Sequence, residues 1–226
     1  MNPEDIKNAS EAIKNASAFG IEAIKFIRVL TDEPMKELSG ILSDKLKFYR
    51  WRNQQQILLK AAEYLRSNNI LTRKIPLREL IPLLEYSSME DEELLQDLWA
   101  GILANSANSN SSNRSNLVFI EILKSLSKME AEILQVISSI PNCMNPNGVI
   151  LTTYLPATAQ MMTPPPSGAR SSLLPNDDVT LALANLDRLG CISIVKSIGG
   201  DQMFEFIKCT ELGIRLVQIC TVAKTV

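Results

Sequence analysis

The sequence contains no histidine among its 226 residues. This absence excludes Ser-His-Asp and Cys-His catalysis, and with them every metal site that needs a histidine ligand. The cysteines show no CxxC spacing, so neither a zinc knuckle nor a redox dithiol is indicated. We interpret them as buried apolar side chains in a reduced cytosol. They are Cys143, Cys191, Cys209 and Cys220. The sequence therefore predicts no catalytic residue, no metal site and no cofactor.

The sequence also lacks long apolar runs and an excess of charge of either sign. No uncharged apolar run approaches the ~18 residues needed to span a bilayer, and residues 1–17 lack the basic-then-apolar layout of a secretory signal. Residues 1–117 carry 15 basic and 16 acidic side chains, and residues 118–226 carry 8 and 9. Because neither half has a basic excess, non-specific nucleic-acid binding is not favoured. We expect a cytoplasmic protein.

Helical periodicity is the main pattern that is present. From Pro3 to Leu30, apolar residues recur at intervals of three and four, which predicts a helix packed on the domain. The alternative is an amphipathic helix that lies on a membrane surface with its cations near the lipid headgroups. Those cations are Lys7, Lys14, Lys25 and Arg28.

A second helical segment follows Pro34 and is predicted to run to about Asn69. Its residues 44–56 interleave four cations with three aromatic residues. Such a pattern can stack bases and pair phosphates, although on a helix the rings more often enter the core. The cations are our candidate partner-binding residues: Lys45, Lys47, Arg50 and Arg52. A protein partner, a second copy of the chain or an anionic membrane surface fits them better than nucleic acid.

The middle of the chain carries two Ser-x-x-Glu patterns. Ser87 with Glu90, and Ser127 with Glu130, have the spacing of a helix capping box. The first box would place residues 90–93, all acidic, at the positive end of a helix dipole, which explains the cluster without a metal. Trp99 falls on the buried stripe of that helix. Residues 105–116 hold five Asn and five Ser, which predicts an exposed connection that buries nothing.

The last third of the chain changes character. Five prolines between Pro156 and Pro175 predict a loop over residues 156–176 with little regular structure. A helix capped by Asn176 or Asp177 and ended by Gly190 should follow. Two β-rich runs around residues 199–201 predict one hairpin, and a final helix is expected to begin at Thr210.

This order of elements resembles a winged helix-turn-helix domain over residues 127–221. In DNA-binding domains of this kind, the second helix of the motif enters the major groove. Here that helix offers Asp177, Asp178 and Asp187 against Arg188, a balance that favours protein contact over DNA. The predicted fold is mainly α. A helical domain spans residues 1–115, and a winged-helix-like α+β domain with one β-hairpin spans residues 116–226.

Three stretches, within residues 46–65, 81–108 and 119–134, together resemble the bacterial Abi-alpha (abortive infection alpha) family. The similarity covers about residues 40–140, with a weaker echo at Leu212 and Gly213. The matching positions are Arg50, Trp51, Asn53, Pro82 to Glu85, Glu90, Asp91, Leu94, Gln96, Trp99, Ala100, Leu103, Ala104, Asn105, Leu126 and Ser127. The resemblance implies a role in bacterial defence against phage, and it carries over no catalytic residue and no mechanism.

Taken together, these patterns predict a non-enzymatic component of an antiphage abortive-infection system. It would act through protein contacts, with a membrane surface as a second site of action for its amino-terminal helices. The alternative is a winged-helix DNA-binding transcriptional regulator. An enzyme that uses carboxylate chemistry ranks third, because every carboxylate pair in the sequence has a simpler structural explanation.

Overall fold

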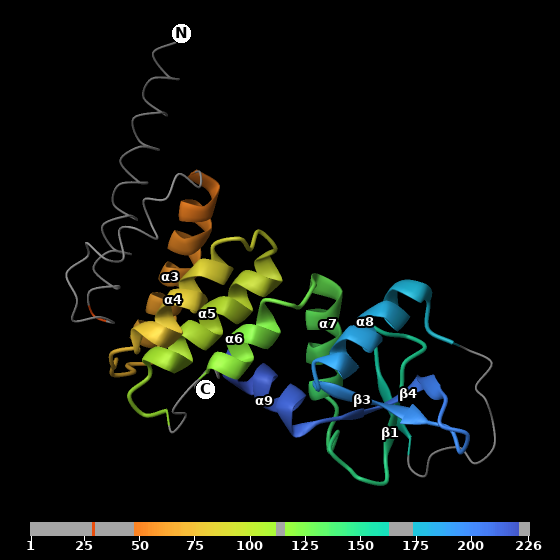
Figure 1. Ribbon diagram of the computed structural model, residues 1–226. Helices are drawn as coiled ribbons and strands as arrows, with labels where there is room; N and C mark the ends of the chain where they lie inside the picture. Colours follow the sequence, from red (N-terminus) through yellow and green to blue (C-terminus); the bar gives the residue numbers. More distant parts are fainter. Residues whose placement is uncertain (1–28, 30–47, 112–115, 163–173, 222–226) are drawn as a thin grey trace, which may run out of the picture. The chain divides into compact units, whose positions relative to one another are not determined.

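The computed structural model describes Val29 and residues 48–111, 116–162 and 174–221. The chain divides into two compact units (Figure 1). Unit 1 comprises residues 1–124 and 220–226, and unit 2 comprises residues 125–219. The helix expected near the amino terminus lies outside the described residues, as do Lys45, Lys47 and most of the proline-rich loop.

Unit 1 is helical. Its helices are α3 (Phe48–Ser67), α4 (Leu77–Ser87), α5 (Glu93–Ala107) and α6 (Leu117–Leu123), and α5 packs against the other three. Trp99 of α5 is 1% exposed, so its predicted position in the core is confirmed. The buried core of unit 1 also contains aliphatic side chains that recur along these helices, such as Ile57, Leu83 and Leu103, all fully buried. Burial of these side chains drives the packing of the four helices.

The first predicted capping box is wrong. Ser87 is the last residue of α4, where its hydroxyl donates to the Leu84 carbonyl, and α5 begins six residues later at Glu93 with Glu92 as its N-cap residue. Glu90 instead accepts a hydrogen bond from the Glu92 amide at 3.1 Å, in the turn between the helices. The Ser-x-x-Glu spacing is present, but Ser87 belongs to the last turn of α4, where its hydroxyl makes a hydrogen bond, so it does not cap α5.

The prediction that residues 105–116 bury nothing is also wrong for the described part of this segment. The helix α5 continues to Ala107, and Ser106, Ala107 and Asn116 are buried. The Ser109 amide donates to the Leu71 carbonyl at 2.9 Å, so the backbone after α5 is tied to the α3–α4 connection. The polar side chains of Ser106 and Asn116 therefore make hydrogen bonds in the core instead of contacting water.

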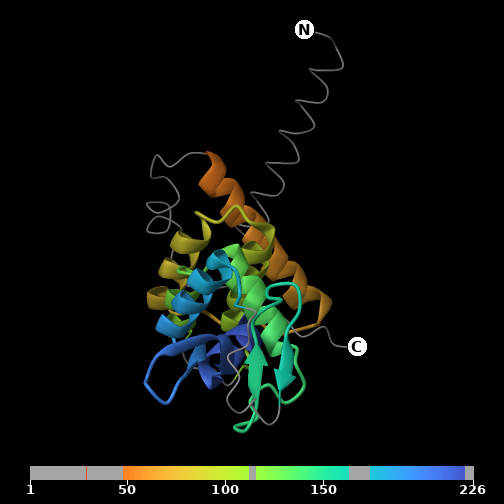
Figure 2. The same cartoon turned by 90° about the vertical axis from the view of Figure 1, so that its right-hand side faces the viewer.

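Unit 2 combines helices with a sheet. Its elements are α7 (Lys128–Ser138), β1 (Val149–Leu151), β2 (Gln160–Met162), α8 (Asp177–Arg188), β3 (Ile192–Lys196), β4 (Gln202–Cys209) and α9 (Glu211–Cys220), the last residue of which belongs to unit 1. The strands form one antiparallel sheet in the order β2-β1-β4-β3. Figure 2 shows the arrows of β1 and β2 side by side.

This sheet corrects the expectation of a single hairpin. The predicted hairpin is present as β3 and β4, but β1 and β2 form a second one, and β1 pairs with β4 to join the two. The strand β2 lies inside the segment that was predicted to be a loop. Three-residue strands are too short to produce a recognisable alternation in the sequence, and their stability depends on the neighbouring strands.

The helix ends in unit 2 follow the sequence closely. Ser127 and Glu130 form the second predicted capping box, in which the Ser127 amide donates to the Glu130 carboxylate. Asn176 caps α8 by accepting from the Val179 amide at 2.8 Å, and Gly190 ends it with a φ of 73°. Thr210 accepts from the Gly213 amide at 3.1 Å and so begins α9 as predicted. These caps use only local bonds, which is why the sequence reveals them.

No helix within residues 48–111, 116–162 and 174–221 is both long and apolar enough to cross a membrane.

Candidate functional site

Two of the four predicted partner-binding cations lie in the described residues. They are Arg50 and Arg52, both on α3. Arg50 is half-buried, and its Nε donates to the Ser88 hydroxyl at 2.8 Å. Two further α3 side chains donate to carbonyls of the α4 carboxyl end: Asn53 to Ser88 at 3.4 Å, and Gln54 to Leu84 at 2.9 Å. Arg52 is exposed. The start of α3 therefore holds the end of α4.

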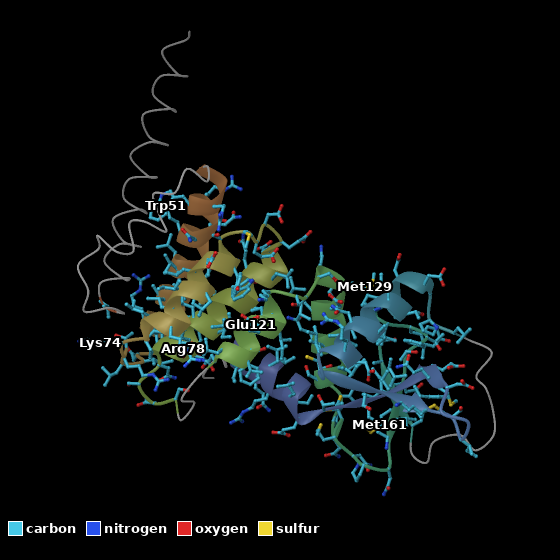
Figure 3. The ribbon with its side chains drawn as sticks, in the orientation of Figure 1. Trp51, Lys74, Arg78, Glu121, Met129 and Met161 are labelled. Atoms are coloured by element: carbon cyan, nitrogen blue, oxygen red, sulfur yellow. The ribbon has the colours of Figure 1, made fainter. Side chains whose placement is uncertain are left out.

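This arrangement is favourable for two reasons. Gln54 adds a donor to the Leu84 carbonyl, which also accepts from the Ser88 amide. Asn53 donates to the carbonyl of Ser88, the residue that follows the helix and has no further turn of helix to bond with. The positive charge of Arg50 lies at the negative end of the α4 dipole. Figure 3 shows Trp51, which is half-buried, projecting from the side of α3. Arg50 thus has a structural role within unit 1, whereas Arg52 is exposed.

A buried polar cluster that the sequence did not reveal lies where α4, α5 and α6 meet. The carboxylate of Glu79, which is 6% exposed, accepts from the Ser106 hydroxyl at 2.7 Å. The Ser106 hydroxyl accepts in turn from Asn116 Nδ2 at 2.6 Å, and Arg73 Nε donates to the Ser106 carbonyl at 3.0 Å. A sequence gives no spacing signal for this cluster, because its members are up to 43 positions apart.

The Glu79 cluster pairs a carboxylate with a hydroxyl, which are groups that general-base chemistry also uses. However, Ser106 and Asn116 are almost completely buried, and each makes a hydrogen bond within the cluster. The arrangement satisfies groups that would otherwise be unpaired in the core, and it links three helices. Its observable role is therefore to fix the helix ends in unit 1.

The acidic run at residues 90–93 spreads into the connection between α4 and α5. Asp91, Glu92 and Glu93 are exposed, whereas Glu90 is half-buried. Burial raises the pKa of the Glu90 carboxyl above its usual value, although the Glu92 amide partly opposes this effect. Among the described side chains, no three cysteine, aspartate or glutamate residues are grouped as metal ligands.

The exposed surface of unit 2 around α8 combines acidic and apolar side chains. Asp177 and Asp178 lie exposed in the first turn of α8, and Leu181, one turn further along the helix, is 73% exposed. Ile198 is fully exposed in the turn between β3 and β4. Asp187 is used internally, because its carboxylate accepts from the Ile194 amide at 2.9 Å. We refer to Asp177, Asp178 and Leu181 as the α8 face.

The basic residues of unit 2 do not offset its acidic residues. Arg188 donates from Nε and Nη2 to the Asn185 side-chain oxygen, at 3.1 and 2.6 Å. Lys208 donates to the Pro146 carbonyl at 2.9 Å. Between Ser125 and Ile219 the sequence holds six Lys and Arg and eight Asp and Glu, a net charge of −2. A phosphate backbone would find little compensation on unit 2.

The cysteines of unit 2 differ in their surroundings. Cys191 is 1% exposed, and burial together with the negative charge of Glu130 raises its pKa to about 11. Cys143 and Cys209 are both half-buried. Burial and the proximity of Cys143 raise the pKa of Cys209 to about 12. The expectation of four buried cysteines therefore holds for Cys191 and Cys220, and not for this pair.

These observations define an α+β protein that consists of a helical unit and a unit with a four-stranded antiparallel sheet. The chain belongs to the abortive infection alpha family, whose family model matches residues 49–220. The match includes all of the described helices and strands except the first residue of α3. It also extends the resemblance noted in the sequence from about residue 140 to the end of α9. No curated protein and no solved structure matches the chain.

The positions that resemble the family now have observable structural roles. Arg50 and Asn53 hold the end of α4, Trp99 fills the core of unit 1, and Ser127 begins α7. Gly213, the weaker echo, lies in α9 against the backbone of Cys191, where an added Cβ would be 2.0 Å from the carbonyl oxygen. At these five positions, the sequence similarity is therefore carried by residues that maintain the fold.

Proposed function

We propose that the chain is a non-enzymatic component of a bacterial antiphage abortive-infection system and acts in the cytoplasm through protein contacts. Membership of the abortive infection alpha family supports the role in abortive infection. The partner is another protein or a second copy of the chain. An anionic membrane surface is a second place of action, reached through the amino-terminal cations.

The protein-contact role is assigned to unit 2, which we propose to be a winged-helix-type domain. Two features support this fold. The helix α8 directly precedes the β3–β4 hairpin, and β4 lies between β3 and β1 in the sheet. Such an arrangement lets a helix and the tip of a hairpin present side chains to a common partner.

The side chains of the α8 face favour a protein over DNA as the partner of unit 2. Asp177 and Asp178 would repel phosphates at the helix start, where a DNA-binding helix would approach the duplex. Leu181 exposes a large apolar side chain that gains nothing from contact with a phosphate backbone. Burial of this side chain against an apolar pocket would instead favour association with a protein.

The test replaces Leu181 with glutamate in the full chain, expressed together with its genomic neighbours in a bacterium challenged with phage. We expect protection to fall at least about tenfold, because a charge in the centre of a contact opposes its desolvation. The matched control is Val118→Glu, which adds the same charge at an exposed apolar position on α6. Circular dichroism should show that both variants are folded.

Normal protection by Leu181→Glu would overturn the role of the α8 face. The alternative, a winged-helix transcriptional regulator, is tested with the same proteins by fluorescence anisotropy on a random duplex of roughly 30 base pairs. Affinity that falls steeply with salt and is lost when Arg188 and Lys196 become glutamine would favour that alternative. Our proposal expects no such binding at physiological salt.

A further inference from the structure

We infer that α8 is a dimerisation surface, on which the α8 helix of a second copy of the chain packs antiparallel about a two-fold axis. This inference rests on the proposed function, because it names the partner of the α8 face. One side of α8 packs against α7 and β3 and is buried; its residues are Val179, Ala182, Leu183 and Leu186. The opposite side carries a row of side chains that we call the α8 stripe: Asp177, Leu181, Ala184 and Arg188.

The α8 stripe follows from helical periodicity. At about 100° per residue, its four positions lie within roughly 60° of one another, on the far side of the helix from the buried residues. Asp177 and Arg188 are exposed, Leu181 is 73% exposed, and Ala184 is half-buried. The stripe therefore runs along the exposed side of α8 for about 17 Å, with a charge at each end and apolar side chains between them.

The charges at the two ends of the stripe have opposite signs. Asp177 lies in the first turn of α8 and Arg188 in the last. Within the described part of the chain, neither side chain forms an ion pair. Arg188 bonds Asn185 through Nε and Nη2, which leaves other N–H groups of the guanidinium for a further acceptor. A row with one charge of each sign complements a copy of itself that runs in the opposite direction.

The spacing of the stripe lets one two-fold axis satisfy all of its residues. With the axis between residues 182 and 183, Asp177 faces Arg188 of the second copy, and Leu181 faces Ala184 of the second copy. A large side chain opposite a small one allows the two helices to approach to the usual distance of about 8 to 10 Å. The contact also removes two exposed leucine side chains from water. A parallel pair in register would instead oppose like charges.

A second copy fits this surface better than an unrelated protein, because the same four residues supply both halves of the contact. Two helices that meet over about 17 Å bury less than the roughly 800 Å² per partner of a standard interface. The dimer is therefore weak, with a dissociation constant on the order of 10 to 100 µM.

The experiment measures the mass of the full chain by sedimentation equilibrium, from about 5 to 500 µM protein. We expect the average mass to rise from the 25.1 kDa of the monomer toward twice that value. Leu181→Glu should raise the dissociation constant more than about tenfold, because it places a charge in the centre of the contact. Val118→Glu, which adds the same charge on α6, is the matched control and should leave the constant unchanged.

An exchange of charges makes the test specific for an antiparallel pair. Asp177→Arg and Arg188→Asp each place like charges opposite one another, so each variant alone should dimerise at least about tenfold more weakly. An equimolar mixture of these two variants restores both pairs of opposite charge and should dimerise as tightly as the parent. Asp178→Arg is the matched control. It makes the same change about 100° away around the helix from Asp177, so it should weaken the dimer less.

Circular dichroism should show that every variant is folded. If a charge variant does not fold, the comparison of Leu181→Glu with Val118→Glu still decides the question. A parent chain that stays monomeric up to about 500 µM, or a dimer that Leu181→Glu leaves unchanged, would overturn the inference. A mixture no tighter than its components, or equal effects of Asp177→Arg and Asp178→Arg, would also overturn it.

The failure of this inference can be distinguished from the failure of the proposed function. If the parent chain is monomeric but Leu181→Glu loses phage protection, the α8 face binds a different protein and the proposed function stands. If the parent chain dimerises through the stripe but Leu181→Glu protects normally, the dimer stands and the proposed role of the α8 face is overturned.

Discussion

The two units contain the same four-residue pattern and use it differently. In unit 2, Ser127 and Glu130 form a capping box at the start of α7. In unit 1, Ser87 and Glu90 have the same spacing, but Ser87 ends α4 and Glu90 lies in the following turn. A local motif therefore determines a helix start only where the preceding element leaves its residues available. Where another helix ends at the same place, tertiary packing decides.

The units also differ in their aromatic side chains, although both contain a close approach of backbones. Unit 1 buries a large aromatic side chain, Trp99, which is 1% exposed. Gly101 of α5 lies against the Cys220 carbonyl in unit 1, and Gly213 of α9 lies against the Cys191 carbonyl in unit 2. Thr210 strengthens the second of these contacts by donating to the Gly190 carbonyl at 2.6 Å. Both tryptophans, Trp51 and Trp99, belong to unit 1, so fluorescence reports on unit 1, whereas circular dichroism reports on both.

The largest expected effect comes from the core of unit 1. Trp99→Ala should lower the free energy of unfolding of unit 1 by about 3 to 5 kcal/mol, since it removes a fully buried side chain and leaves a cavity. Urea denaturation followed by Trp51 fluorescence measures the loss. The matched control is Trp51→Phe, which changes a half-buried ring and should cost much less. Equal losses for the two variants would contradict the assignment of the core.

The corresponding change in unit 2 is Gly213→Ala. It should destabilise unit 2 by roughly 3 kcal/mol, because its Cβ would overlap a backbone oxygen that cannot move aside easily. Gly199→Ala is the control, since the added Cβ would meet no atom closer than 3.7 Å. Circular dichroism should show an earlier transition for Gly213→Ala, while the tryptophan transition stays in place. If both transitions move together, the units unfold as one and the comparison fails.

The two Ser-x-x-Glu patterns can be compared directly through their glutamates. Glu130→Ala should cost about 1 to 2 kcal/mol, because it removes an acceptor for the Ser127 amide and the Asn185 side chain in a buried position. Glu90→Ala should cost less than about 0.5 kcal/mol, since burial already raises the pKa of Glu90 and so opposes its charge. Denaturant titrations of both variants measure the difference. A larger cost at Glu90 would reverse the ranking of the two patterns.

A small effect is also expected at the start of α5. Glu92→Gln and Glu93→Gln should each weaken stability by roughly 0.3 to 1 kcal/mol, because both carboxylates lie near the positive end of the helix dipole. Thermal melts at low and high salt should show that the loss shrinks as salt rises. Phage protection should be unchanged in both variants. Loss of protection with a normal melt would point to a functional role for the acidic run.

Much of unit 2 was predictable because its signals are local. Asn176, Gly190 and Thr210 lie within a few residues of the groups that they bond or cap, and the β3–β4 turn follows from its glycines. The strands β1 and β2 were missed, since each has three residues and gains stability from a partner elsewhere in the chain. The Glu79 cluster was missed for the same reason: nothing in the spacing of its residues indicates contact.

By itself, the sequence determined the helical character of unit 1, the core position of Trp99, the β3–β4 hairpin, four helix ends in unit 2 and the family. These features depend on periodicity and on bonds between near neighbours, which remain the same whatever the rest of the chain does. Only the tertiary structure decided that Arg50 holds α4, that Ser106 and Asn116 are buried, and that four strands form one sheet. Hydrogen-bonding groups of serine, asparagine and arginine can be satisfied by water or by protein, and the choice depends on which distant segments exclude the water.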